Sequence, residues 1–286
     1  MHSVAVVITT FKNPGRLSQL LENMEWAGVP EIPVYVFEDR APSADWVDWH
    51  VRNAEVCDRF KWVSRFETTP KWGCMHGVIE YAMQHTEERW IIYVPDDVAF
   101  TRGGLLQEHA AALAYGRDFV GAIQAPYWNA DELHQMGVVR RLDEPFETAS
   151  VVHVPRNTHW DNGGIPRIYI NVNGAGFTLN RDVFEEMGRV WPKSTWRLDE
   201  WFAWKVWNSG RVCLTVPGPP RVHRMGGATH LMPKGLKFSS VEGWMEATGG
   251  LDPTATGMRT REIMHRLPGE DWVSVYRFFS AGGSIG

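Results

Sequence analysis

The segment that most constrains the fold of this chain runs from Trp90 to Val98, with the sequence Trp-Ile-Ile-Tyr-Val-Pro-Asp-Asp-Val. A continuous run of aromatic and β-branched residues predicts a strand that is buried on both faces. Pro95 has no backbone N–H, so the chain is expected to leave the sheet there. Asp96 and Asp97 follow at the carboxyl edge of the sheet, where open α/β folds bind ligands. Their oxygen atoms suit Mg²⁺ or Mn²⁺ bridging a diphosphate, although a solvated Asp-Asp turn is the plainer alternative.

Strand and helix patterns alternate along the rest of the chain. The expected strands are residues 4–8, 33–37, 60–65, 90–94, 119–124, 168–172 and 212–216, with short strands such as 150–154 outside the main sheet. The expected helices are residues 14–26, 73–85, 103–115, 182–187 and 199–209, with a helix or loop at 45–56 and a terminal helix around 260–266. This order predicts an α/β fold whose mostly parallel central sheet is flanked by helices.

Composition narrows the class of protein. A hydrophobic content of 44% and a charged content of 22% are ordinary for a soluble globular protein. The net charge of −5 gives no global basic field for nucleic acid or an anionic membrane. The three cysteines are widely spaced, which fits a reduced, cytoplasmic protein. The apolar run Val4–Ile8 is too short for a signal peptide or an integral membrane segment.

Two strand ends carry a resemblance to a known family. The segment Val6–Pro14 resembles the first strand and loop of GT-A glycosyltransferases of the large inverting families, family 2-like enzymes among them. The acid pair Glu38-Asp39 matches the place where that fold holds the base or ribose of the donor. The resemblance implies a GT-A fold. It also implies donor contacts by a set of residues at these strand ends, namely Thr9, Thr10, Phe11 and Asp39.

The acidic segment Tyr93–Val98 is similar to the Glu-Asp-Asp metal motif of the N-acetylglucosaminyltransferase that starts complex N-glycans. The resemblance implies that Asp97 is a ligand of Mn²⁺ or Mg²⁺ and that Asp96 lies near the ribose or sugar of the donor. Pro95 replaces the first acid of the motif, which leaves open the sugar contact at that position.

A third segment, Trp191–Trp201 followed by Gly210-Arg211-Val212-Cys213, matches the same family at nearly the same spacing. Residue-by-residue comparison with this family implies Glu200 as the general base. Comparison with the broader Glu-Asp helix of inverting enzymes, aligned on Gly210, implies Asp199 instead. An acid at a helix N-terminus stays ionised and can accept the proton of an attacking hydroxyl. Asp199 can alternatively be an N-cap that stabilises the helix, with Glu200 doing the chemistry.

Further donor and metal contacts follow from the same resemblance. His223 is the expected additional metal ligand, with His230 as the second choice. Other donor contacts are expected from residues in loops, namely Lys71, Gly174 and Arg224. The leaving diphosphate can also be neutralised by Lys234 or Lys237, and Gly226-Gly227 is the expected hinge of a closing loop.

These features predict an inverting, metal-dependent glycosyltransferase that moves a sugar from a UDP-sugar to a hydroxyl acceptor. The acceptor stays open among modified DNA, a glycan and a lipid-linked sugar; phage-type transfer to hydroxymethylated DNA is one hypothesis. Residues 1–230 are the expected catalytic domain, with a nucleotide-sugar half to about residue 125 and an acceptor half from about 126. Residues 231–286 are expected as an extension packed on the same domain.

Two alternatives remain. A sugar-nucleotide nucleotidyltransferase needs a Gly-rich, basic phosphate loop after the first strand, and Thr9–Gly15 is a poor match. A catalytically inactive glycosyltransferase-like binding module is favoured by Pro95, whereas Asp97 and the pair Asp199-Glu200 argue against it.

Overall fold

A computed structural model describes residues 3–11, 13–39, 46–69, 75–129, 166–169, 172, 174, 176–186, 198–218, 221–223 and 261–285. Its strands are β1 (Val4–Thr10), β2 (Val34–Glu38), β3 (Arg65–Thr68), β4 (Trp90–Pro95), β5 (Val98–Phe100), β6 (Val120–Gln124), β7 (Tyr127–Asn129), β8 (Arg167–Tyr169), β9 (Thr178–Asn180), β10 (Val212–Thr215) and β11 (Arg221–His223). Its helices are α1 (Pro14–Ala27), α2 (Trp46–Arg59), α3 (Met75–His85), α4 (Gly104–Tyr115), α6 (Arg181–Glu186), α7 (Leu198–Asn208) and α10 (Trp272–Ser280).

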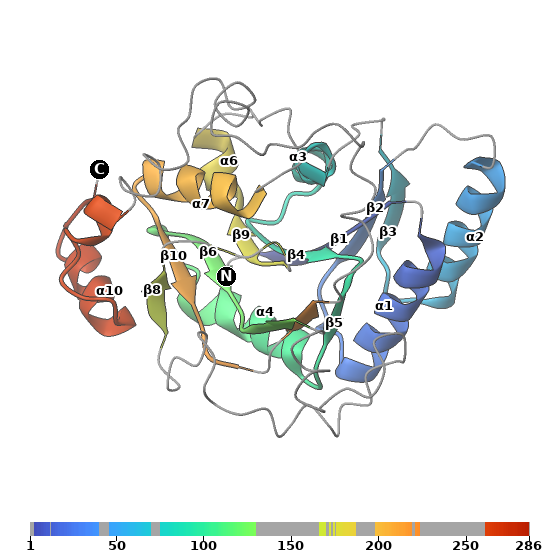
Figure 1. Cartoon of the computed structure of the whole chain (residues 1–286), viewed down its shortest axis with the longest axis horizontal. Helices are drawn as coiled ribbons and strands as arrows, with labels where there is room; N and C mark the ends of the chain where they lie inside the picture. Colours follow the sequence, from blue (N-terminus) through green and yellow to red (C-terminus); the bar gives the residue numbers. More distant parts are fainter. Residues whose placement is uncertain are drawn as a thin grey trace.

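The main sheet has the strand order β3-β2-β1-β4-β9-β6-β10-β8 (Figure 1). The chain moves outward from β1 to β2 and β3, and then returns to place β4 on the other side of β1. Strands β1 and β4 are therefore a topological switch point, and ligands of open α/β sheets bind at the carboxyl ends of such a pair. Both strands are buried along their whole length, as their continuous apolar sequences predict.

Helices cover both faces of this sheet. Contacts place α3 against β1 and β2, and α7 against β6 and β10, with α6 packed on α7. Helices α1 and α4 contact one another and cover the opposite face, and α4 contacts β4 and β6 (Figure 1). The expected mostly parallel sheet flanked by helices is confirmed.

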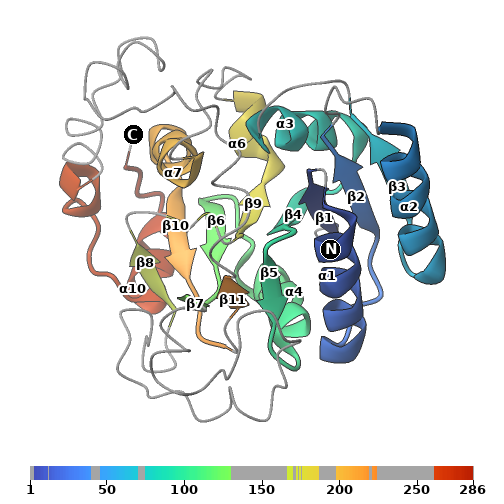
Figure 2. The ribbon, with the colours of Figure 1, turned by 45° about the vertical axis from the view of Figure 1, so that its right-hand side comes forward.

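A second, three-stranded sheet has the order β5-β11-β7. Strand β5 follows β4 almost at once, and β11 lies beside it (Figure 2). The two strands pair antiparallel, with His223 opposite Val98. This small sheet therefore brings a segment from late in the chain beside the turn that carries Asp96 and Asp97.

Several expectations differ from the structure. The strand expected at 60–65 is β3 at Arg65–Thr68, because Phe60 and Val63 form a turn closed by the Val63 N–H donating to the Phe60 carbonyl (2.9 Å). Strand β9 was not expected; it lies antiparallel between β4 and β6.

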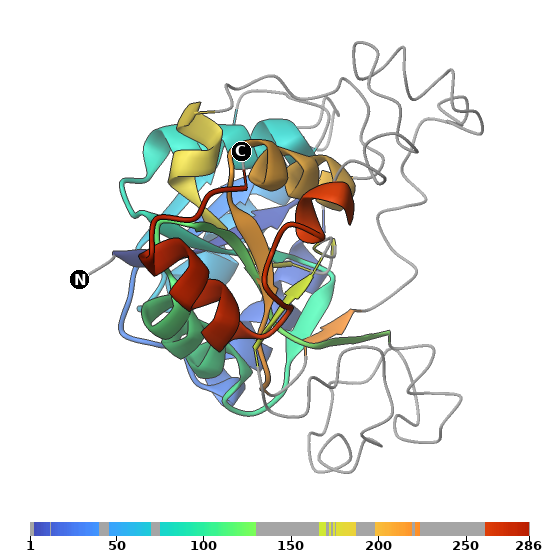
Figure 3. The same cartoon turned by 90° about the vertical axis from the view of Figure 1, so that its left-hand side faces the viewer.

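The C-terminal expectation was incomplete. Residues 261–264 are helical as expected, but the longer α10 lies outside the predicted helix. Its Trp272 and Phe279 pack on Phe119, and Trp272 also contacts Tyr115 at the end of α4. Helix α10 lies beside α4, the red and green helices of Figure 3. The division into two halves and an extension stays a prediction, as does the short strand at 150–154, which lies outside the described residues. None of the helices in the described ranges has both the length and the hydropathy to cross a lipid bilayer.

Candidate functional site

The first part of the site spans the switch point between β1 and β4. The Thr10 hydroxyl donates to Asp96 Oδ2 at 2.7 Å, and the Phe11 N–H lies 3.4 Å from the same oxygen. The Asp96 N–H in turn donates to the Thr9 carbonyl at 3.1 Å. Burial raises the pKa of Asp96 to about 6, and the hydrogen bond from Thr10 opposes that rise. Asp96 is thus tied to the loop after β1.

The two threonines at the end of β1 have different neighbours. Thr9 is fully buried, and its hydroxyl contacts the Tyr93 hydroxyl at 3.4 Å. Thr10 is equally buried but faces the acidic turn through Asp96. Donor binding by Thr9, Thr10 and Phe11 stays a prediction. The hydroxyls of both threonines already contact protein groups.

The second part of the site pairs Asp97 with His223. His223 Nε2 lies 3.2 Å from Asp97 Oδ2, and the two side chains are 24% and 20% exposed. Sequence analysis named both residues as metal ligands, and β11 brings them together although 126 positions separate them. Asp97 Oδ1 is buried and has no hydrogen-bond partner among the described residues.

This donor set fits a divalent cation. A carboxylate and an imidazole suit Mn²⁺, and an orphaned carboxylate oxygen in a partly buried site is expected to have a missing partner. Within the described ranges no group of three or more His, Cys, Asp and Glu side chains could hold a metal. Two protein ligands are enough when a diphosphate supplies further oxygens, as is usual for Mg²⁺ with phosphate substrates.

The acids after β2 lie at the same edge of the sheet. Asp39 is 3% exposed, and its N–H donates to the Thr10 carbonyl at 2.9 Å. Glu38 is fully buried, with its Oε2 3.2 Å from His50 Nδ1 and 3.5 Å from the Thr68 hydroxyl. The sequence predicted Asp39 as the donor contact but did not predict the Glu38–His50 pair, because His50 lies in helix α2 and reaches Glu38 only in the folded protein.

Helix α7 carries the two candidate bases in its first turn. Because α7 begins at Leu198, Asp199 lies within the helix rather than before it, which contradicts its assignment as the N-cap. The side chains of Asp199 and Glu200 lie outside the described residues. Gly210, with φ of 72°, follows the end of the helix in the left-handed conformation typical of a helix C-terminus.

Several predicted residues cannot be placed. Gly174 is described in a turn, whereas the remaining loop residues lie outside the described ranges, namely Lys71, Arg224, Gly226, Gly227, His230, Lys234 and Lys237. The donor role of Gly174 stays a prediction.

The structure adds a buried ion pair that sequence analysis missed. Arg221 is fully buried, and its guanidinium makes a bidentate contact with the Glu108 carboxylate. Its Nη1 donates to the Tyr93 carbonyl at 2.8 Å. A local sequence pattern cannot predict this pair, because its two residues are 113 positions apart in the chain.

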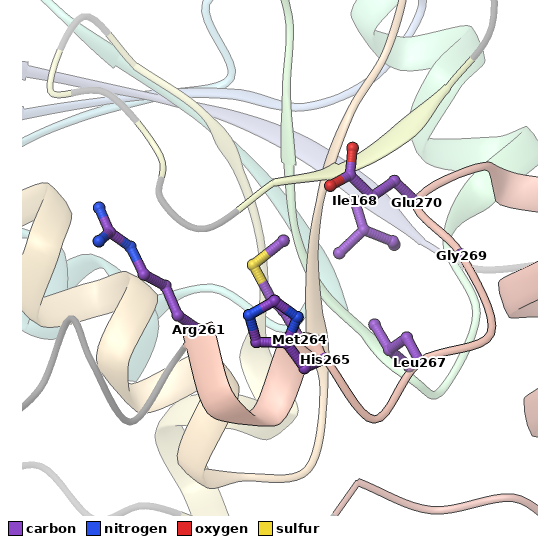
Figure 4. Close-up of a pocket in the computed structure, with 7 residues that line it drawn as sticks. All are labelled: Ile168, Arg261, Met264, His265, Leu267, Gly269 and Glu270. Atoms are coloured by element: carbon purple, nitrogen blue, oxygen red, sulfur yellow. The ribbon is translucent and has the colours of Figure 1, made fainter.

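A surface cavity of about 240 Å³ lies elsewhere, between β8 and the segment before α10 (Figure 4). Its lining residues are Ile168, Arg261, Met264, His265, Leu267, Gly269 and Glu270. None of the predicted site residues lines it, and most of its wall is one exposed segment, so we attach no function to it.

No protein-family model and no curated protein sequence matches the chain. Solved structures do. S. aureus TarS (residues 1–349) in complex with UDP-GlcNAc is 10% identical with a TM-score of 0.55, over 86% of this chain and 64% of that one. The mannosyltransferase PcManGT from Pyrobaculum calidifontis, in complex with GDP-Man and Mn²⁺, is 16% identical with a TM-score of 0.54, over 90% and 64%. The fold is that of the GT-A glycosyltransferases.

The GT-A fold agrees with the position of the acidic turn at the switch point. A mycobacterial protein is a third similar structure, 10% identical with a TM-score of 0.53, over 88% of this chain and 76% of that one. The chain spans less than two thirds of the length of the TarS and PcManGT chains, and only 37% of a longer TarS chain. At these identities the likeness establishes the fold alone.

Proposed function

We propose that this protein is a metal-dependent glycosyltransferase that moves a sugar from a nucleoside-diphosphate sugar, most simply a UDP-sugar, to a hydroxyl acceptor with inversion. One observation carries the proposal: Asp97 and His223 converge at the switch point of a GT-A fold, and Asp97 keeps an oxygen without a partner among the described residues. TarS is in complex with UDP-GlcNAc and PcManGT with GDP-Man and Mn²⁺, which supports a donor of this class.

Each side chain then has a part in the chemistry. Asp97 and His223 would hold Mn²⁺ or Mg²⁺, which when bound offsets the charge of the leaving diphosphate. The Thr10–Asp96 contact fixes the loop beside the donor. Glu200, or Asp199, takes the proton of the acceptor hydroxyl as its oxygen attacks the anomeric carbon. The bond from that carbon to the diphosphate breaks, and the nucleoside diphosphate leaves with the electron pair.

The donor is tested by nucleotide release. The full chain is incubated with Mn²⁺ and, separately, UDP-GlcNAc, UDP-glucose and GDP-mannose, and free UDP or GDP is measured over time. We expect slow hydrolysis of a UDP-sugar that stops with EDTA. Release that is unaffected by EDTA would contradict metal dependence, and no release or binding with any donor would leave the inactive binding module.

The base is tested by a matched pair of variants in α7. We expect Glu200→Gln to lower kcat by about 10²–10⁴-fold while donor binding persists, because general-base catalysis contributes about that much. Asp199→Asn is the comparison, and the larger loss identifies the base. Asp58→Asn, at an exposed carboxylate on α2, is the control for charge alone.

The acceptor is a separate part of the proposal. Under the DNA hypothesis, basic and aromatic residues of the segments 140–167 and 234–237 would contact phosphates and bases, and these segments lie almost wholly outside the described residues. Transfer to hydroxymethylated DNA predicts DNA affinity that falls steeply with salt. Binding that is absent, or insensitive to salt, with both modified and plain DNA would remove DNA and leave glycan and lipid-linked acceptors.

A further inference from the structure

We propose that Arg221 is a positioning residue of the cation site, fixing the separation of Asp97 and His223 from beneath the acidic turn. The inference rests on the proposed function, since it assumes that these two side chains hold a divalent cation. The contacts of Arg221 that carry the argument are with Tyr93, Glu108 and Phe100, so its effect passes through the strands that hold the two side chains.

Arg221 joins three elements that meet under the turn. Its Nη1 donates to the Tyr93 carbonyl at 2.8 Å, near the end of β4. Its bidentate contact with Glu108 reaches α4, and the guanidinium lies over the Phe100 ring of β5, 5.1 Å from the ring centre. All of this occurs with Arg221 fully buried and Glu108 4% exposed.

The contact with Tyr93 stands where strand pairing stops. Strand β9 pairs with β4 only over residues 90–92, and the Tyr93 N–H still donates to the Phe177 carbonyl at 2.9 Å. The Arg221 side chain supplies a donor to the Tyr93 carbonyl just beyond the last paired residue of β4, Ile92 opposite Thr178 of β9. Arg221 therefore continues the support of β4 toward Asp97, four positions further along the chain.

The same residue sets the position of His223. Successive side chains alternate along a strand, so Arg221 and His223 share one face of β11. Arg221 pairs with Phe100 and His223 with Val98 in the β11–β5 ladder. One side chain thus ties the strand of the imidazole to the strand that leads to the carboxylate.

Gly176 makes room for this arrangement. It has φ of 107°, and a Cβ built there would lie 1.7 Å from Arg221 Nη1 and 2.6 Å from the Tyr93 carbonyl oxygen. The absence of a side chain at Gly176 thus lets the backbone approach the guanidinium closely. The Gly176 carbonyl also accepts from Gln124 Nε2 at 2.9 Å, which holds the segment in place.

If Arg221 and Glu108 served only to stabilise the fold, two apolar side chains could replace them. Buried ion pairs can often be replaced by apolar side chains of similar volume without loss of stability, whereas removing one partner is costly. The double variant Arg221→Met/Glu108→Leu should therefore fold and yet lack the link to Tyr93. Groups that orient metal ligands typically change metal affinity by about 10–100-fold when removed.

The test measures Mn²⁺ binding directly. Free Mn²⁺ is quantified by electron paramagnetic resonance as Mn²⁺ is titrated into the full chain, and folding is followed by circular dichroism and thermal unfolding. We expect the double variant to keep its fold while its Kd for Mn²⁺ rises by about 10-fold or more. Arg221→Lys should also weaken binding, because one ammonium cannot reproduce the planar fork that reaches both partners.

A second pair of variants tests the same geometry without removing charge. Gly176→Ala pushes a methyl group into the guanidinium, whereas Gly210→Ala also places a side chain at a positive φ, 72°, but with no atom within 4 Å of the new Cβ. We expect Gly176→Ala to weaken Mn²⁺ binding and Gly210→Ala to leave it unchanged.

The outcomes separate the two proposals. If folded variants at Arg221 and Gly176 bind Mn²⁺ as the wild type does, the positioning role is wrong and the cation site stands. If affinity falls only in proportion to the unfolded fraction, Arg221 is structural and the positioning role is likewise wrong. If the wild type itself binds no Mn²⁺, with or without UDP, the cation site is wrong and the positioning role fails with it.

Discussion

Asp96 and Asp97 are neighbours in one turn, but the two sides of that turn are built differently. On the Asp96 side, the carboxylate receives a hydrogen bond from Thr10 of the adjacent strand β1. On the Asp97 side, His223 comes from the remote strand β11, and one carboxylate oxygen has no partner among the described residues. The carboxylate of Asp96 thus accepts hydrogen bonds from the protein, whereas the neighbouring carboxylate of Asp97 keeps an oxygen that can still bind a ligand.

The difference suits the two residues to different roles: Asp96 holds the adjacent backbone in place, and Asp97 is suited to bind a cation. A hydrogen-bonded carboxylate such as Asp96 fixes its surroundings, and binding a metal there would first have to break that bond. Asp97 faces an imidazole nitrogen, and a carboxylate with an imidazole is a pair that would hold a divalent cation. Single substitutions can test each side of the turn separately, and Lys205, a buried charge elsewhere in the fold, gives a comparison.

The largest effect is expected from Asp97→Asn. Losing a carboxylate ligand removes several kcal/mol of charge stabilisation at the leaving diphosphate, so kcat/KM should fall by about 10²-fold or more. Steady-state donor turnover measures it, with Asp58→Asn as the exposed control. A variant that retains wild-type turnover would show that Asp97 is no more than a turn residue.

A buried charge away from the turn gives the next effect. Lys205 of α7 is 1% exposed, its ammonium lies 5.8 Å from the centre of the Phe184 ring, and burial lowers its pKa to about 8. Between pH 8 and about 10 the unfolded chain binds more protons than the native one, so stability rises with pH there. At pH 7 the buried charge costs stability.

The free energies of unfolding of Lys205→Met at pH 7 and pH 9.5 should therefore differ less than those of the wild type, because methionine binds no proton. Urea titrations at pH 7 and pH 9.5 measure both quantities. Lys61→Met, at an exposed position, is the matched control. If Lys205→Met destabilises the protein at pH 7, the ammonium has stabilising contacts that outweigh its burial.

On the Asp96 side, Thr10→Val should lower the free energy of unfolding by about 2 kcal/mol, because it removes a hydrogen bond to a charged group and leaves that carboxylate without its best donor. Thr10→Ser keeps the hydroxyl and should lose much less. Thermal unfolding compares the two. Equal losses would mean that packing of the threonine methyl, and not its hydroxyl, holds the loop.

His223→Gln tests the weaker half of the cation site. We expect the Kd for Mn²⁺ to rise by about 10-fold, since one of two protein ligands is replaced by a poorer one. Mn²⁺ titration measures it, and His265→Gln is the control at an exposed histidine. Unchanged affinity would assign His223 to the structure of the turn alone.

The sequence predicted those parts of the fold whose causes are local. The apolar runs of β1 and β4, Pro95 and the acids after it follow from residue type and order, so the switch point and its acids were predictable. Strand β9 was not, because its three residues, Thr178–Asn180, owe their strand to the neighbours on either side. The pairs Arg221–Glu108 and Glu38–His50 depend on tertiary contacts that no single-sequence pattern encodes.

The most direct test of the central claim is calorimetric titration of UDP, GDP and their sugars into the full chain, with Mn²⁺ and with EDTA, for the wild type and Asp97→Ala. The account predicts binding of UDP or a UDP-sugar that requires Mn²⁺ and is lost in Asp97→Ala while the variant stays folded. Nucleotide binding that is equal with EDTA and in Asp97→Ala, or no nucleotide binding in any condition, would contradict it.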